Sequence, residues 1–322
     1  MQPLYPLLLQ PALHVKVWGG RKLADVLGKA LPTDEPYGES WELHDSVTVA
    51  NGPLAGRTIA ELVALYGEEL IGPGGNTALG FPLLAKFLDA RDWLSVQVHP
   101  NDAQAQAYGD GERGKTEAWY VVQAEPGASL VIGVKPGATR ETIVDAIAQS
   151  TLEESLVYAP VQAGDVLFVK TGTIHALGPG LLIYEIQQSS DITYRFYDWG
   201  RLGLDGQPRA LHIEKSLAVS TLDSLPEIKH TASHDDTIVP IVACEFFETE
   251  LIQLRAGDIV RFGRSERGQF DALTCIDGEA TISSGEDTLT IGLGQTVLIP
   301  AAVRDYQLFG RARILRSTQP RA

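Results

Sequence analysis

The chain has 322 residues, of which 44% are hydrophobic and 21% are charged, and its formal net charge is −15. This length and composition are typical of a soluble globular protein with one large domain or two moderate ones. The acidic charge argues against nucleic-acid binding as the main task, because neutralising phosphates needs a basic surface. An anionic small molecule is still compatible with the sequence, provided that Lys and Arg gather locally.

The N-terminal segment is apolar but does not have the pattern of a signal peptide. It lacks a basic start and is interrupted by Pro3, Pro6 and Pro11. No apolar run is long enough for a membrane span. Cys244 and Cys275 form no metal-binding pair, and so few cysteines fit a reducing compartment. We therefore expect a cytoplasmic protein that binds no membrane.

Helical patterns occur at three places in the chain. Apolar residues recur at three- and four-residue spacing over 58–70, 138–156 and 209–222, which predicts amphipathic helices. From about residue 80 to 200, most of the remainder consists of short apolar runs divided by Gly, Pro and Asp turns. These runs predict strands, so the first part of the chain is expected to be a β domain with helices inserted.

A second strand-rich block begins near residue 237, after a segment at 226–236 that is typical of a linker. Its strands recur at the spacing expected of an antiparallel barrel or sandwich. The segments 163–177 and 293–308 share a pattern of glycine, apolar strand and turn, but the second lacks the His of the first. This weak similarity favours a duplicated barrel in which one copy kept a site, although any two hairpins can look alike.

Polar side chains enter otherwise apolar strands in the middle of the N-terminal half. Strand alternation places Ser95, Gln97 and His99 on one face. Glu117 begins the next strand-like run, and His175 follows a later one. Two imidazoles and a carboxylate suit zinc or another borderline divalent ion, with the amide of Gln97 as a weaker fourth ligand. Because the set contains no thiolate, it is typical of a catalytic rather than a structural site.

Each of these side chains also has a simpler interpretation. A lone His in a strand is more often packed and hydrogen-bonded than bound to metal. The Gln97 amide could bond to the backbone, and Glu117 could lie at the surface. The chain has only seven His, so two in such settings favour a site, but spacing alone leaves the two interpretations about even.

Six motifs bear on this choice: "VWGGRKL", "GESWEL", "LSVQVHPND", "GKTEAWYVV", "GTIHALGPG" and "EIQQSSDITYRFYDW". Together they resemble the type I phosphomannose isomerases, specifically the short bacterial form, and they cover most of residues 15–201. The resemblance implies a mainly β fold of two cupin-type (jelly-roll) barrels, with added α-helices packed on the N-terminal part. A catalytic cupin domain with helical insertions is expected at 1–230, and a second, metal-free cupin-like barrel at 237–322.

The resemblance also implies an activity and a metal site. The family interconverts mannose 6-phosphate and fructose 6-phosphate through an enediol intermediate and uses one zinc ion per chain. Its metal ligands fall on Gln97, His99, Glu117 and His175 of this sequence. These are the residues that the strand argument had already selected.

Further polar residues gain roles from the same resemblance. Arg195 is a candidate catalytic residue that could stabilise an enediolate oxygen or hold phosphate through two hydrogen bonds. Without the resemblance, it would be interpreted as a surface arginine stacked on a neighbouring ring. Asp191 shares its strand parity and could face the same site. Lys86 and Lys115 match basic residues at the family's active site, and Ser95 is a candidate substrate contact.

The identity of the general base is open. In longer relatives a His directly precedes the Lys of this motif, but here that position is Gly114. Lys115 shares a strand face with Glu117 if the strand extends that far back, so a neutral amine there could take the proton. Alternatively, Lys115 stays charged and grips phosphate, in which case Asp191 is the next candidate base.

Two other functions compete with the isomerase. Cupins with two His and one Glu often hold iron and activate oxygen, so an iron-dependent dioxygenase is one alternative, although the glutamine and the nearby lysines argue against it. A non-catalytic sugar-phosphate-binding cupin is the other. The expected partner is a small-molecule sugar phosphate and not nucleic acid, and the sequence leaves both a monomer and a dimer open.

Overall fold

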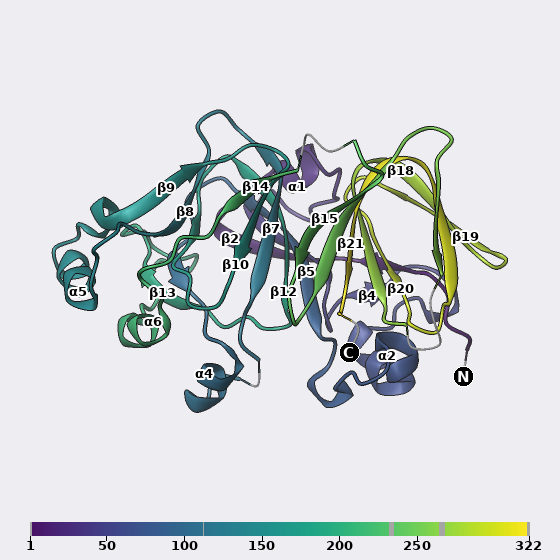
Figure 1. Ribbon diagram of the computed structural model, residues 1–322, viewed down its shortest axis with the longest axis horizontal. Helices are drawn as coiled ribbons and strands as arrows, with labels where there is room; N and C mark the ends of the chain where they lie inside the picture. The colour runs from purple at the N-terminus through teal and green to yellow at the C-terminus, as the bar shows by residue number, and fades with distance from the viewer. Residues whose placement is uncertain (1, 112, 232–234, 264–267, 321–322) are drawn as a thin grey trace.

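The computed structural model describes residues 2–111, 113–231, 235–263 and 268–320. Figure 1 shows two β-rich lobes side by side, the N-terminal lobe mainly in purple to teal and the C-terminal lobe in green to yellow. The expectation of a mainly β fold of two cupin-type barrels with added helices is confirmed. Among the described residues, no helix is long and apolar enough to cross a membrane.

A seven-stranded sheet and two smaller sheets form the N-terminal lobe. Its central strands β5 (Leu83–Ala90) and β12 (Leu181–Gln188) are buried along their whole length, which fits their nearly unbroken apolar runs. They pair antiparallel with each other, and β12 also pairs with β7 (Glu117–Ala124). The large sheet is completed by β10 (Asp165–Val169), β14 (Ile228–His230), β3 (Tyr37–Leu43) and β2 (Ala12–Gly20). One small sheet contains β8 (Ser129–Val134), β9 (Leu156–Pro160) and β11 (Ala176–Leu177). The other pairs β6 (Val96–Val98) with β13 (Tyr194–Tyr197).

The nine-stranded sheet of the C-terminal lobe includes the first strand of the chain. Strand β1 (Leu7–Gln10) pairs with β20 (Thr296–Ile299) and with β4 (Thr48–Val49). The N-terminal segment therefore ties the two lobes together, and the domain division at 1–230 and 237–322 stays a prediction. The other strands of this sheet are β15 (Ile238–Ala243), β16 (Glu248–Leu254), β17 (Ile259–Gly263), β18 (Asp271–Ser284), β19 (Asp287–Gly292) and β21 (Asp305–Thr318).

The segment expected to be a linker is partly ordered into the sheet. Strand β14 falls within 226–236 and pairs with β10, so this stretch supplies an edge strand. Residues 232–234 lie outside the described residues.

The predicted helix at 58–70 is two helices. They are α2 (Ile59–Tyr66) and α3 (Glu68–Ile71), separated by Gly67. Gly67 has a φ of +53°, which ends the first helix in a conformation that costs glycine little.

The other two predicted helices are also shorter than their apolar patterns. Helix α5 (Arg140–Ala148) ends just before Ser150, whose φ of +58° is incompatible with a continuing helix. The rest of 138–156 forms a short 3₁₀ turn that leads into β9. Only α6 (Ile213–Val219) forms within 209–222. The remaining helices are α1 (Lys22–Asp25) and α4 (Asp102–Ala107), with 3₁₀ turns η1 (Gly52–Leu54), η2 (Thr77–Leu79) and η3 (Leu152–Ser155).

A continuous hydrophobic core joins the two lobes. Phe81, next to β5, packs against Phe270 before β18, with 4.6 Å between ring centroids. On β12, the Tyr184 hydroxyl lies 3.3 Å from that of Ser317 on β21. Strands β5 and β12 are therefore held from both sides, which gives the polar residues that they carry a rigid base.

Candidate active site

Three segments bring the candidate metal ligands together. A bridge joins β6 to the turn before β11: the N–H of Gln97 donates to the carbonyl of His175 at 3.0 Å, and the N–H of His175 donates back at 2.9 Å. His99 directly follows β6, and Glu117 is the first residue of β7. His99, Glu117 and His175 are fully buried, and their ligand atoms lie within 4.8 Å of one another.

Hydrogen bonds hold both imidazoles in the tautomer that can bind a metal. Nδ1 of His99 lies 2.7 Å from the carbonyl oxygen of Ile192, and Nδ1 of His175 lies 2.9 Å from that of Thr173. Since a carbonyl only accepts, each Nδ1 donates and each Nε2 carries a lone pair. The Nε2 atoms of His175 and His99 are 3.3 and 3.5 Å from the two carboxylate oxygens of Glu117. The three side chains therefore direct their ligand atoms at one point.

The electrostatics of this cluster suit a cation. Burial lowers the pKa of His175 to about 4 and holds the pKa of His99 well below its ordinary value, so both rings are neutral near pH 7. Burial and the charge of Glu185 raise the pKa of Glu117 to about 7. Apart from its ion pair with Lys115, the Glu117 carboxylate accepts no hydrogen bond of good geometry from the described residues. A divalent ion would supply the missing partner.

Gln97 lies beside the three ligands but presents its nitrogen to them. Its Nε2 is 3.3 Å from Nε2 of His175, while its oxygen accepts a hydrogen bond from the Ser95 hydroxyl at 3.1 Å. A half-turn of the amide would exchange the two atoms and direct the oxygen toward the cluster. Gln97 as the fourth ligand stays a prediction.

A line of alternating charges leads away from the cluster. Nζ of Lys115 is 2.8 Å from Glu117 and 3.9 Å from Glu185. Nζ of Lys86 is 2.9 Å from Glu185 and 4.0 Å from Glu39. The sheet register explains the Lys86 pair, since Lys86 on β5 lies directly opposite Glu185 on β12. Although burial opposes it, the charges of Glu185 and Glu39 raise the pKa of Lys86, so this lysine is cationic.

A cavity of about 240 Å³ opens over this line of charges. Arg195, on β13, reaches it because it lies opposite Gln97 in the two-stranded sheet. Asp191 precedes β13, so strand parity does not place it, yet it also lines the cavity. The candidate residues that line this cavity are Lys86, Ser95, Gln97, Lys115, Asp191 and Arg195.

The cavity wall also contains charged residues that the sequence did not single out. Glu185 had a signal, because a lone carboxylate within the buried apolar run of β12 requires a partner. Arg209 and His212 belong to the loop after β13, and no spacing rule relates them to the ligands. The residues missed in this way are Lys16, Glu39, Glu185, Arg209 and His212.

Steric crowding explains why the residue before Lys115 is a glycine. A Cβ on Gly114 would lie 2.4 Å from the carbonyl oxygen of Pro100, which no side chain tolerates without a backbone shift. Its N–H donates to the Asp102 carboxylate at 2.7 Å, which fixes the chain at this close approach. The structure therefore has no room for a His side chain at this position.

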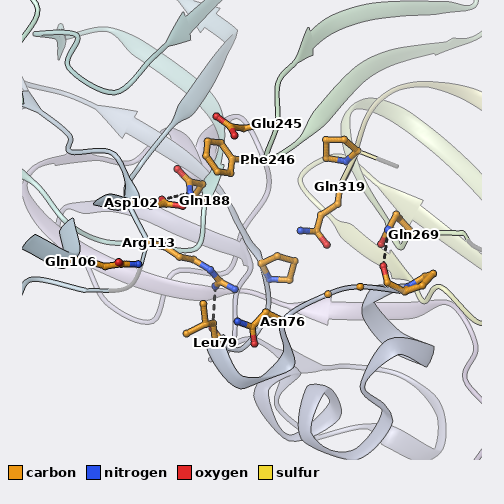
Figure 2. Close-up of a pocket in the computed structure, with 15 residues that line it drawn as sticks. Asn76, Leu79, Asp102, Gln106, Arg113, Gln188, Glu245, Phe246, Gln269 and Gln319 are labelled. Carbon is orange, nitrogen blue, oxygen red and sulfur yellow. Dashed lines mark hydrogen bonds between the residues drawn. The ribbon is translucent and has the colours of Figure 1, made fainter. Parts of the chain in front are cut away.

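A larger cavity lies elsewhere, between the two lobes. This cavity has a volume of about 720 Å³. Figure 2 shows its wall, in which Asp102 and Arg113 from the N-terminal half face Phe246 and Gln319 from the C-terminal half. It shares no lining residue with the smaller cavity and contains none of the candidate ligands. Arg113 is occupied with the carbonyls of the loop beside it, at 3.0 Å from that of Leu79. The smaller cavity, whose wall includes Gln97 and Lys115 next to the candidate metal ligands, is the better candidate for catalysis.

The fold and the site define an enzyme of the two-barrel cupin class in which two His and one Glu form a candidate metal site. Residues 7–126 match the catalytic domain of type I phosphomannose isomerase, and residues 237–319 match the cupin domain of mannose-6-phosphate isomerase. A mannose-6-phosphate isomerase of Streptococcus mutans is 35% identical over 97% of this chain and 98% of its own length. The chain belongs to the type I mannose-6-phosphate isomerase family.

Solved structures agree with this assignment. The mannose 6-phosphate isomerase of Bacillus subtilis superposes with a TM-score of 0.87 at 31% identity, over 97% of this chain and 99% of the other. A zinc-bound mannose 6-phosphate isomerase shares the fold at 17% identity, with a TM-score of 0.79 over 98% of this chain and 100% of the other.

Proposed function

We propose that the protein interconverts mannose 6-phosphate and fructose 6-phosphate in the cavity next to the candidate metal site. The observation that carries this proposal is the meeting of His99, Glu117 and His175 beneath a cavity whose wall is rich in Lys and Arg. An open-chain sugar phosphate needs both features, because the reaction develops charge on two sugar oxygens and the substrate carries a phosphate. Membership of the family supports the same substrate pair.

The proposed metal is one zinc ion per chain, held by His99, Glu117, His175 and Gln97. When bound, it would polarise a sugar oxygen and lower the free energy of the enediol intermediate. The neutral imidazoles and the buried carboxylate are the donors that zinc prefers.

The proposed roles of the other residues follow from where they lie. Lys115, which lies between Glu117 and Glu185 next to the candidate metal ligands, is our candidate to move the proton between C1 and C2, with Asp191 as the second candidate. Lys86 and Ser95 are proposed to hold the hydroxyls of the sugar. Arg195, which lies opposite Gln97 in the two-stranded sheet, is proposed to stabilise an enediolate oxygen.

The proposal is tested by a coupled assay for fructose 6-phosphate formed from mannose 6-phosphate by the purified protein. We expect turnover in both directions and no oxygen uptake by a ferrous-loaded sample. Binding of mannose 6-phosphate without turnover would contradict the proposal and would favour a sugar-phosphate-binding protein. Oxygen uptake would favour a dioxygenase instead. A cytoplasmic location and a monomeric or dimeric state remain predictions from the sequence.

Replacing Arg195 by Lys is expected to lower kcat more than it raises KM, although the charge is kept. Nη1 of Arg195 donates to the carbonyl of Ala210 at 2.9 Å, and its Nε is buried without a partner among the described residues. A lysine cannot both keep the backbone contact and present a planar fork to the substrate. Steady-state kinetics of Arg195→Lys measure the effect, and near-normal kcat would show that charge alone suffices there.

A further inference from the structure

One wall of the cavity and the interface between the lobes are two faces of the same strands. Glu39, Lys86 and Glu185 line the cavity from β3, β5 and β12, which are neighbours in the large sheet. Because side chains alternate along a strand, the residues next to them point to the opposite face. These residues are Ser40, Phe87 and Tyr184, which lie opposite one another in the register. Tyr184 reaches Ser317 of the C-terminal lobe, so the lobe interface lies directly behind the charged wall.

A buried ion pair occupies this interface. Nζ of Lys29 is 2.7 Å from Oε1 of Glu42, and the two side chains are only 7% and 1% exposed. The Ser40 hydroxyl donates to the same oxygen at 2.5 Å. Two apolar side chains of similar volume are often as stable as a buried ion pair or more so, because removing both charges from water is costly. Stability alone therefore does not explain the pair, whereas its fixed geometry specifies one arrangement of the groups around it.

Both partners of the ion pair are held by the C-terminal lobe. Nζ of Lys29 also donates to the carbonyl of Gly294, at 2.7 Å, in the turn before β20. The hydroxyl of Thr296, the first residue of β20, donates to Oε2 of Glu42 at 3.3 Å. The approach is close, since a Cβ on Gly294 would lie 2.7 Å from the carbonyl oxygen of Leu27. The second lobe therefore sets where Glu42 lies.

Glu42 lies at an irregularity of β3. The register between β3 and β5 shifts between Trp41 and Leu43, so Glu42 is an extra residue there, as in a β-bulge. A bulge bends its strand and re-aims the side chains beside it. Trp41, just before the bulge, lies opposite Lys86 and donates from Nε1 to the Glu39 carboxylate at 2.7 Å. The contacts of Glu42 thus determine where Trp41 holds Glu39.

Glu39 in turn affects the charges on the cavity wall. Its carboxylate is 3.1 Å from Nζ of Lys16 and 4.0 Å from Nζ of Lys86. Although burial opposes it, the charges of Lys86 and Lys16 lower the pKa of Glu39 to about 2, so the carboxylate is ionised near pH 7. Displacing Glu39 would leave Lys86 with Glu185 as its one ion-pair partner among the described residues. The ammonium group that is proposed to hold the sugar would then move.

We propose that Lys29 and Glu42 are positioning residues for substrate binding: they fix the bulge of β3, and the bulge keeps Glu39 against Lys86. The C-terminal lobe thereby contributes to the active site from a distance, since Lys29, Glu42 and Thr296 do not line the cavity. The assignment rests on the proposed function for the identity of the substrate.

The first test uses the zinc-loaded protein and two variants of Thr296. Thr296→Val keeps the shape of the side chain and removes the hydroxyl, so KM for mannose 6-phosphate should rise roughly 3- to 10-fold, the usual effect of one lost hydrogen bond. Thr296→Ser keeps the hydroxyl and should have a near-normal KM. Thr290→Val is the matched control, because the Thr290 hydroxyl contacts that of Thr281 on the surface of the same lobe. A KM in Thr296→Val equal to that of the unaltered protein would overturn the assignment.

The second test separates positioning from stability. Lys29→Met leaves a buried carboxylate unpaired and should lower the melting temperature. The double variant Lys29→Met/Glu42→Leu removes both charges and should melt near the unaltered protein, but its KM should stay raised roughly 10-fold or more because the bulge is no longer fixed. A double variant with a normal melting temperature and a normal KM would show that the pair is only structural and would overturn the assignment. If the double variant does not fold, the Thr296 variants decide.

The proposed function would fail in a different way. An unaltered protein that binds mannose 6-phosphate without turning it over would refute the isomerase. The positioning of Glu39 would then be tested by the same variants, with dissociation constants from calorimetric titration with mannose 6-phosphate in place of KM.

Discussion

His99→Ala and His175→Ala should each lose bound metal and lower isomerase activity roughly 1,000-fold or more, because the ion contributes several kcal/mol to the transition state. Each substitution removes one of the two nitrogen lone pairs that face Glu117 at 3.3 and 3.5 Å. The buried carboxylate of Glu117 and the one remaining imidazole would then form an incomplete ligand set for a cation. Elemental analysis and the coupled assay on the same samples measure both effects.

His230→Ala is the matched control for these variants. His230 is also a histidine on a strand of the N-terminal lobe, but it is largely exposed and pairs with Asp165, far from the ligand set in the sheet. This variant should keep its metal and its activity. Full metal content in both His99→Ala and His175→Ala would show that the ion is bound elsewhere.

Lys115→Met should lower kcat roughly 100- to 10,000-fold, the range expected for the loss of a general base. Nζ of Lys115 lies 2.8 Å from Glu117 and 3.2 Å from Nε2 of His99, so the amine is beside the cluster and not among the arginines. Methionine keeps an unbranched side chain of similar volume and lacks the amine. KM for mannose 6-phosphate should change by a few-fold at most, as steady-state kinetics would show.

Lys86→Met is the companion experiment, since Lys86 is equally buried and shares Glu185. Lys86→Met should raise KM, and it should lower kcat less than Lys115→Met does. If Lys115→Met instead raises KM with kcat intact, the lysine grips the substrate and Asp191→Asn becomes the test of the base. Normal kinetics in both Lys115→Met and Asp191→Asn would refute this account of proton transfer.

The grouping of two of the candidate ligands could be predicted from the sequence because strand alternation acts over short distances. Gln97 and His99 are two residues apart, so any regular strand places them on one side. The pairing of this strand with the turn at His175 was not readable from spacing, since 78 residues separate His175 from Gln97. The family resemblance supplied that long-range link, and the structure brings His99, Glu117 and His175 together as expected.

The sequence could not predict contacts that depend on the register of the sheet or on the conformation of loops. Glu185 becomes the partner of Lys86 only because β12 and β5 pair in one register. Arg209 comes from an irregular loop, for which no periodicity exists. The length of the helix predicted at 138–156 was overestimated because the apolar pattern continues past Ser150, where the backbone has a positive φ.

We propose that His99, Glu117 and His175 hold the metal on which the isomerase activity depends. The experiment is to remove metal with a chelator, verify its absence by elemental analysis, and add zinc back in steps while the conversion of mannose 6-phosphate is followed. We expect an inactive metal-free protein whose activity rises with bound zinc and reaches its maximum at about one ion per chain. Full activity in the verified metal-free sample would contradict it.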